Sequence, residues 1–196
     1  MNRIVVATIT LACFAHPAVA QDCPTAKHGK AGFAVERSGS SATEVYHLDN
    51  GQTRTIGRFI GNLTLEVTHH EGLFQLERID RGKRSIMKPQ SDLPPAKALK
   101  PGATVEVSFD QTGDGAPASV RRVQLKVVGQ DKLGIGPCTY DVLKIEERVA
   151  YGDAAFGAVG VNYWSPELKL ILARSSTGPG SSGALHKFDK IKLLPR

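Results

Sequence analysis

Hydrophobic and polar residues alternate with a period of two along most of this chain. Val105, Val107 and Phe109, for example, alternate with Glu106 and Ser108. A strand that buries one face has this spacing, because its successive side chains point to opposite sides. Segments of this kind follow one another with little between them. The pattern predicts a mostly β protein, an antiparallel meander that forms a sandwich or half-barrel.

Turn-forming pairs separate the predicted strands. Asn50-Gly51, Glu71-Gly72 and Arg81-Gly82 each lie between two alternating segments. Asn-Gly favours the tight two-residue turn of a hairpin, and glycine in the other pairs fits a similar role. The strands predicted around these turns cover residues 44–49, 53–60, 63–68, 73–80 and 85–88.

Two segments break the alternation. The prolines within 89–102 exclude a helix longer than a turn or two at 96–100, so we expect a crossover loop between two halves of one domain. A further strand is expected around 120–128. The last segment, 185–194, fits a strand or a short helix, and we favour the strand.

The stretch 138–175 predicts a three-strand meander and contains the chain's single tryptophan. In its first strand, Tyr140 and Val142 share one parity, whereas Leu143 and Ile145 share the other. A β-bulge produces such a phase slip, and so does a strand that is covered on both faces. Both explanations remain open at this point.

The corner Tyr163-Trp164-Ser165-Pro166-Glu167-Leu168-Lys169 closes the second strand of this meander. With the strands around it, it resembles periplasmic β-domain proteins of unknown function, whose sheet is similar to the half-barrels of the LolA/LolB lipoprotein carriers. The resemblance covers the C-terminal third of the chain. It implies a sheet with a concave face and carries over no catalytic residue.

The first 20 residues have the features of a signal peptide. Arg3 is followed by an apolar segment, 4–12, and by an Ala-x-Ala site that ends at Ala20. The apolar segment is too short to span a membrane. We therefore expect a periplasmic or secreted protein of a Gram-negative cell, with cleavage after Ala20, a single β-rich domain over 21–196 and no transmembrane segment in the mature chain. Lipidation at Cys13 is the less favoured alternative, because cutting there would leave an unusually short apolar segment.

Cysteine content supports export. Cleavage removes Cys13 and leaves Cys23 and Cys138. An even pair in an exported protein favours a structural disulfide, which would lower the entropy of the unfolded chain by roughly 4–5 kcal/mol in free energy. A thiol or metal site is the alternative, but the chain has no C-x-x-C spacing.

Two segments imitate metal sites. His69 and His70 are adjacent, so on a strand they point to opposite faces and cannot share one ion. The segment 110–115 imitates the start of a calcium loop, but Arg121 occupies the position where such a loop needs a glutamate. We predict no metal and no cofactor, with His70 facing solvent at a strand end.

Basic residues concentrate around one predicted hairpin in a chain of net charge +6. The candidate anion-binding residues are Arg78, Arg81, Lys83, Arg84 and Lys88. A solvated surface accounts for such a run, and so does attraction to anionic lipid, lipopolysaccharide or an envelope polymer. Nucleic acid is an unsuitable partner for an exported protein. Because strand residues alternate between faces, not all five can converge.

No catalytic set is evident in the sequence. It contains no nucleophile elbow, phosphate-binding loop or paired-carboxylate motif. We predict a non-catalytic binding or structural module of the cell envelope. The alternatives are a lipid or lipoprotein carrier with a half-barrel cavity and a small exported hydrolase.

Overall fold

The computed structural model describes residues 22–38, 41–59, 63–114, 116–177 and 183–195. The predicted signal peptide lies outside them. The strands are β1 (Phe33–Arg37), β2 (Ser41–His47), β3 (Gln52–Phe59), β4 (Thr64–His70), β5 (Phe74–Asp80), β6 (Lys83–Pro89), β7 (Thr104–Gly113), β8 (Ala116–Ile135), β9 (Cys138–Tyr151), β10 (Val159–Ser165), β11 (Leu170–Thr177), β12 (Leu185–Lys187) and β13 (Lys190–Leu193). Two short 3₁₀ turns, Ala26–His28 and Ala96–Ala98, complete the elements.

All of these strands belong to one antiparallel sheet in the order β12-β11-β10-β9-β8-β7-β6-β5-β4-β3-β2-β1-β13. From β1 to β12 every strand pairs with its neighbour in sequence, and β13 returns to pair with β1. The predicted mostly β, antiparallel meander is confirmed. Its hairpin turns follow the glycine signals, because Asn50-Gly51, Glu71-Gly72 and Arg81-Gly82 all have positive φ at both positions.

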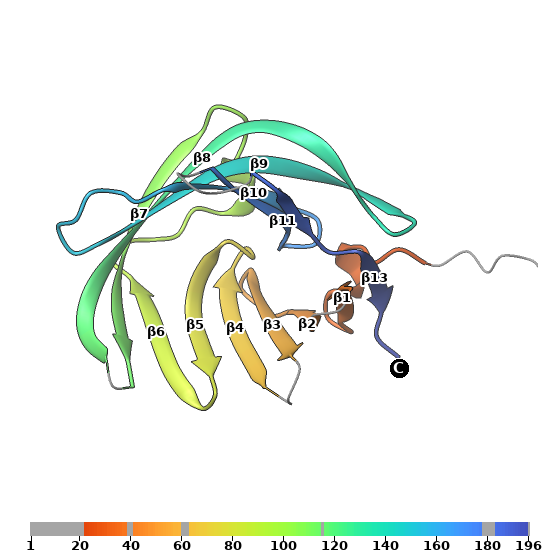
Figure 1. Cartoon of the computed structure of the whole chain (residues 1–196), viewed down its shortest axis with the longest axis horizontal. Helices are drawn as coiled ribbons and strands as arrows, with labels where there is room; N and C mark the ends of the chain where they lie inside the picture. The colour runs from red at the N-terminus through yellow and green to blue at the C-terminus, as the bar shows by residue number, and fades with distance from the viewer. Residues whose placement is uncertain (1–21, 39–40, 60–62, 115, 178–182, 196) are drawn as a thin grey trace, which may run out of the picture.

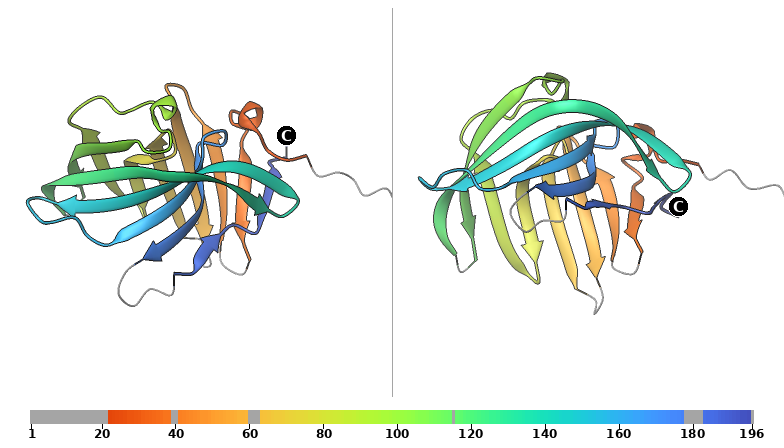
Figure 2. Two further views of the ribbon diagram at one scale, coloured as in Figure 1. Left: turned by 90° about the horizontal axis from the view of Figure 1, so that it is seen from above. Right: turned by 45° about the horizontal axis from the view of Figure 1, so that its top comes forward.

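The sheet curves strongly, so that one part of it covers another. The long strands β8 and β9 run across the top of the molecule above β3 to β6 (Figure 1). The same crossing is visible from above and from an intermediate direction (Figure 2). We call the surface that faces the enclosed space the concave face, and the opposite surface the outer face.

Two apolar cores pack between the layers of the curved sheet. One lies between β1, β2, β11 and β13 and the ends of β8 and β9 that meet in their shared hairpin. It includes Ile135, Tyr140 and Val142. The other lies between β5 to β7 and the part of β8 and β9 away from that hairpin, and includes Leu143 and Ile145. The pairing of β9 skips no residue, so Val142 and Leu143 point to opposite faces of this strand and each core covers one of them. The bulge lies in the neighbouring strand β8, where the register shifts between Val127 and Gly129.

The tryptophan corner connects the two layers. Trp164 is fully buried and its indole N–H donates to the carbonyl oxygen of Glu71 at 2.9 Å. Beside it, a Cβ on Gly72 would lie 1.7 Å from the carbonyl oxygen of Lys169, so only glycine fits this turn. The Lys169 amine also pairs with the Glu71 carboxylate at 3.1 Å. The corner that carried the family resemblance thus has a structural role.

The predicted disulfide is confirmed. Cys23 and Cys138 are bonded and close a loop of 115 residues. The bond ties the N-terminal segment to β9, where the Tyr140 hydroxyl also donates to the carbonyl oxygen of Pro24 at 3.1 Å. Burial raises the pKa of Tyr140 to about 12. No helix in the described part of the chain is long and apolar enough to cross a membrane.

Three sequence predictions about elements need correction. The strand expected at 120–128 extends over Ala116–Ile135, because its two halves cover different cores. The segment 89–102 is no crossover, since it joins the neighbouring strands β6 and β7 and contributes Leu99 to a core. The final segment is two strands, β12 on β11 and β13 on β1, so that it joins the two ends of the sheet.

A candidate anion-binding cavity

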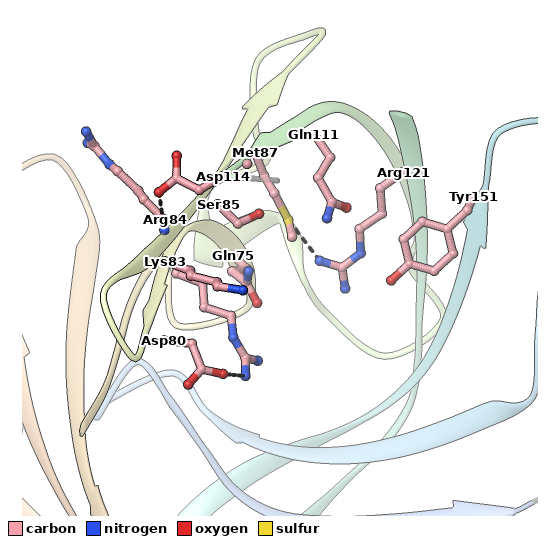
Figure 3. Close-up of a pocket in the computed structure, with 12 residues that line it drawn as sticks. Gln75, Asp80, Lys83, Arg84, Ser85, Met87, Gln111, Asp114, Arg121 and Tyr151 are labelled. Atoms are coloured by element: carbon pink, nitrogen blue, oxygen red, sulfur yellow. Dashed lines mark hydrogen bonds and ion pairs between the residues drawn. The ribbon is translucent and has the colours of Figure 1, made fainter. Parts of the chain in front are cut away.

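A cavity of about 440 Å³ opens on the concave face where the apolar cores end. Strands β5, β6, β7, β8 and β9 and the turns between them supply its walls. The lining residues are Gln75, Arg78, Asp80, Lys83, Arg84, Ser85, Met87, Gln111, Gly113, Asp114, Arg121 and Tyr151, and Figure 3 shows them.

Strand register places these side chains on one face. Arg78 pairs with Ser85 across β5 and β6, and Asp80 pairs with Lys83. Residues directly opposite each other in an antiparallel pair project to the same side of the sheet. On the far side of the cavity, Arg121 in β8 pairs with Tyr151 in β9. Cations from β5, β6 and β8 therefore converge, although they are distant in sequence.

The five predicted basic residues do not converge as a group. Arg78 and Lys83 face the cavity. Arg84 contributes only its backbone side, since its guanidinium pairs with Glu77 on the outer face and points away from the cavity in Figure 3. Lys88 pairs in register with Asp110 on the outer face. Arg81 lies in the turn, with positive φ and with its side chain 72% exposed.

The cavity keeps an excess of positive charge. Arg78 donates to the Asp80 carboxylate at 2.7 Å, and this hydrogen bond holds the pKa of Asp80 below its usual range. The Asp114 carboxylate accepts a hydrogen bond from the backbone N–H of Arg84. Among the described residues, neither Lys83 nor Arg121 forms an ion pair. Both cations therefore remain available to an anion.

Arg121 is a residue of the candidate site that the sequence analysis did not single out. It lies 33 positions after Lys88, the last of the five predicted basic residues, and strand register brings it to the same cavity as Arg78 and Lys83. In the sequence, Arg121 stands out only because it occupies the position where a calcium loop would need a glutamate. The available signal was the alternation in β8. Arg121 has the same parity as the buried residues Val123 and Leu125 and therefore projects from the same face of the strand. An arginine that continues an apolar face marks the point where a core gives way to a polar site.

A smaller cavity of about 100 Å³ adjoins the first and shares Gln75 and Arg121 with it. His69, Glu147 and Arg174 are among its other walls. Burial, followed by the charges of Arg174 and Arg121, lowers the pKa of His69 to about 4. The ring is therefore neutral at pH 7.

The prediction that His70 faces solvent is wrong. The residue is partly buried, and its Nε2 atom is enclosed without a hydrogen-bond partner among the described residues. His70 is the register partner of Phe74, at the end of the β4–β5 hairpin where the two layers meet. Within the described residues, no group of three or more His, Cys, Asp or Glu side chains is arranged to hold a metal ion.

No protein-family model and no curated protein sequence matches the chain. A solved structure, that of the hypothetical lipoprotein YmcC from Escherichia coli (K12), aligns with 11% identity and a TM-score of 0.49, covering 87% of this chain and 89% of that one. The resemblance to LolA/LolB carriers stays a hypothesis from the sequence.

Proposed function

We propose that this protein is an exported, non-catalytic binding module of the cell envelope, and that its ligand is anionic and binds on the concave face. One observation carries the proposal: cations from three strands surround a cavity large enough for a small molecule. Each is placed there by strand register on the face that otherwise forms the core. Polar groups on such a face need a partner or water, so a shared anion fits them.

Two pairs of cations in one hairpin provide a matched test. Arg78 and Lys83 face the cavity, whereas Arg84 and Lys88 project from the outer face. We expect inorganic phosphate, titrated by calorimetry into the mature protein at low salt, to bind weakly and to be displaced by added salt. The double variant Arg78→Gln, Lys83→Gln should lose this binding, and Arg84→Gln, Lys88→Gln should keep it. Equal loss in both variants, or no binding by the wild type, would contradict the proposal.

Vesicles distinguish a small ligand from a membrane surface. Cosedimentation with anionic and neutral vesicles should show little binding, because the outer-face Arg84 and the turn residue Arg81 are already paired with Glu77 and Asp80. Exposed charges act over only about 8 Å at physiological salt. Salt-sensitive sedimentation with anionic vesicles that disappears in the Arg84→Gln, Lys88→Gln variant would instead place binding on the outer face.

Export and the absence of catalysis have their own tests. Intact-mass analysis of the exported protein should show a chain that begins at Gln21, and a diacylated chain that begins at Cys13 would make it an anchored lipoprotein.

Incubation with a panel of chromogenic esters should give no turnover above a heat-denatured control. Turnover that is lost in a cavity variant would favour the hydrolase alternative.

A further inference from the structure

Two residues that line the larger cavity each have a buried polar atom without a hydrogen-bond partner among the described residues. The atoms are Nε of Arg121, a donor, and Oε1 of Gln111, an acceptor. A buried polar group without a partner costs free energy, because it has lost water and gained nothing in exchange. A ligand that supplies both partners would recover that cost.

The two side chains lie close enough to serve one molecule. Gln111 in β7 pairs with Ser119 in β8, so Arg121 is its diagonal neighbour on the same face. Diagonal neighbours are about 7–8 Å apart at Cα, within the reach of long side chains. Figure 3 shows Gln111 and Arg121 side by side, with the guanidinium directed toward Met87.

Met87 occupies one edge of the guanidinium. An Nη1 hydrogen of Arg121 points to the Met87 sulfur at 2.9 Å, and a thioether is a weak acceptor. The Nε hydrogen points elsewhere and is unpaired. A guanidinium binds a carboxylate best through two parallel N–H groups, and Nε provides one of such a pair. The free edge of Arg121 therefore fits a carboxylate, whereas Oε1 of Gln111, as an acceptor, needs an N–H or O–H donor.

We propose that the cavity binds a small carboxylic acid that carries a hydrogen-bond donor on the neighbouring carbon. N-acyl amino acids, which include peptide C-termini, and α-hydroxy acids share this chemistry. Arg121 holds the carboxylate, and Oε1 of Gln111 accepts the neighbouring N–H or O–H. The inference rests on the proposed anion-binding function and names the class of ligand. The smaller cavity beyond Gln75 and Arg121 leaves space for the ligand's substituent.

The test compares four probes that differ in one group each. N-acetylalanine and lactate offer the acid with an N–H or an O–H. N-acetylalanine amide lacks the charge, and N-acetyl-N-methylalanine lacks the donor. We expect NMR titration of the mature protein to show N-acetylalanine, lactate or both binding at least about tenfold more tightly than the amide, as for a hydrogen bond to a charged group. The methylated acid should bind severalfold more weakly than N-acetylalanine, and the stronger of the first two probes identifies the source of the donor.

Variants assign each preference to its residue. Arg121→Gln should abolish the preference for acid over amide, and Gln111→Leu should abolish only the preference for the unmethylated acid. Arg148→Gln and Gln124→Leu are matched controls on the outer face of β9 and β8, where the two residues are register partners, and they should change neither preference.

The possible failures separate this inference from the proposed function. Phosphate binding that depends on Arg78 and Lys83, together with equal affinity for N-acetylalanine and its amide, would overturn the ligand class alone. Retention of the acid preference in Arg121→Gln would overturn the role of Arg121. Absence of both phosphate and acid binding would overturn the proposed function as well.

Discussion

The concave face has two ends of opposite character, and the same strands build both. In β8, Leu125 is buried in an apolar core, whereas Arg121 lines the cavity. In β7, Phe109 and Gln111 make the same change. Residues of equal parity on one strand thus meet packed hydrocarbon at one end and a polar space at the other.

The difference shows how one sheet combines stability with a site. At the closed end, the two layers are held by Trp164, by the buried Glu71 turn and by the disulfide. At the open end, buried polar atoms of Arg121 and Gln111 lack partners, which costs free energy. The packing and the disulfide at the closed end therefore offset the free-energy cost of the unpaired polar atoms at the open end. Loss of a contact at the closed end should lower the free energy of unfolding, whereas removal of an unpaired polar group at the open end should raise it.

The disulfide is expected to have the largest effect. The double variant Cys23→Ser, Cys138→Ser removes a constraint on 115 residues and should lower the free energy of unfolding by roughly 4–5 kcal/mol. Urea unfolding followed by circular dichroism under non-reducing conditions measures the change. Two titratable thiols in freshly purified wild-type protein would contradict the bond itself.

Removal of Trp164 should have a slightly smaller effect. Trp164→Ala leaves a cavity beside the Glu71 turn and should cost about 3–5 kcal/mol of unfolding free energy. The matched change at the open end is Tyr151→Ala, where the side chain is 55% exposed, and it should cost less than about 1 kcal/mol. Similar costs for both aromatic residues would remove the contrast between the ends.

The pH dependence of stability tests His69, which lies between the two ends. Its folded pKa of about 4 is below the usual 6.5, so between these values the unfolded chain binds a proton that the folded chain does not. Its contribution to stability is complete above pH 6.5 and falls as the pH drops toward 4, by about 3 kcal/mol. His47, whose pKa burial also lowers, changes in the same direction.

The variant His69→Gln isolates this contribution. Its loss of unfolding free energy between pH 7 and pH 4 should be smaller than that of the wild type by about 3 kcal/mol. Arg121, Arg174 and Glu147, from β8, β11 and β9, line the same small cavity as the ring. Parallel pH profiles for variant and wild type would mean that the ring stays accessible to protons in the folded chain.

The smallest effect on stability is expected at the cavity, with the opposite sign. Arg121→Met removes the buried, unpaired Nε and should raise the free energy of unfolding by about 1 kcal/mol. Phosphate binding should be lost in the same variant. A clear loss of stability would show that Arg121 belongs to the structural half of the concave face.

Much of the fold could be predicted because its determinants are local. Period-two alternation and the Gly-containing turns define strands β2 to β6 within a few residues, since each hairpin depends on neighbours in sequence. The disulfide could be predicted because the expected cleavage of a signal peptide would leave only Cys23 and Cys138. The split of residues 185–194 between β11 and β1 could not be predicted, because the two ends of the sheet meet only after it has curved.

The site was predicted only in part, for a physical reason. Alternation in β5 and β6 already excludes convergence of all five basic residues, but it does not show which face is concave. Arg78 and Lys83 proved to share that face, and Arg121 joined them from a strand more distant in sequence. The sequence by itself determined most of the strands, their turns and the pairing of Cys23 with Cys138. Only the tertiary structure decided where the core stops, because burial depends on which strand lies across the enclosed space, and that is a property of the curvature of the whole sheet.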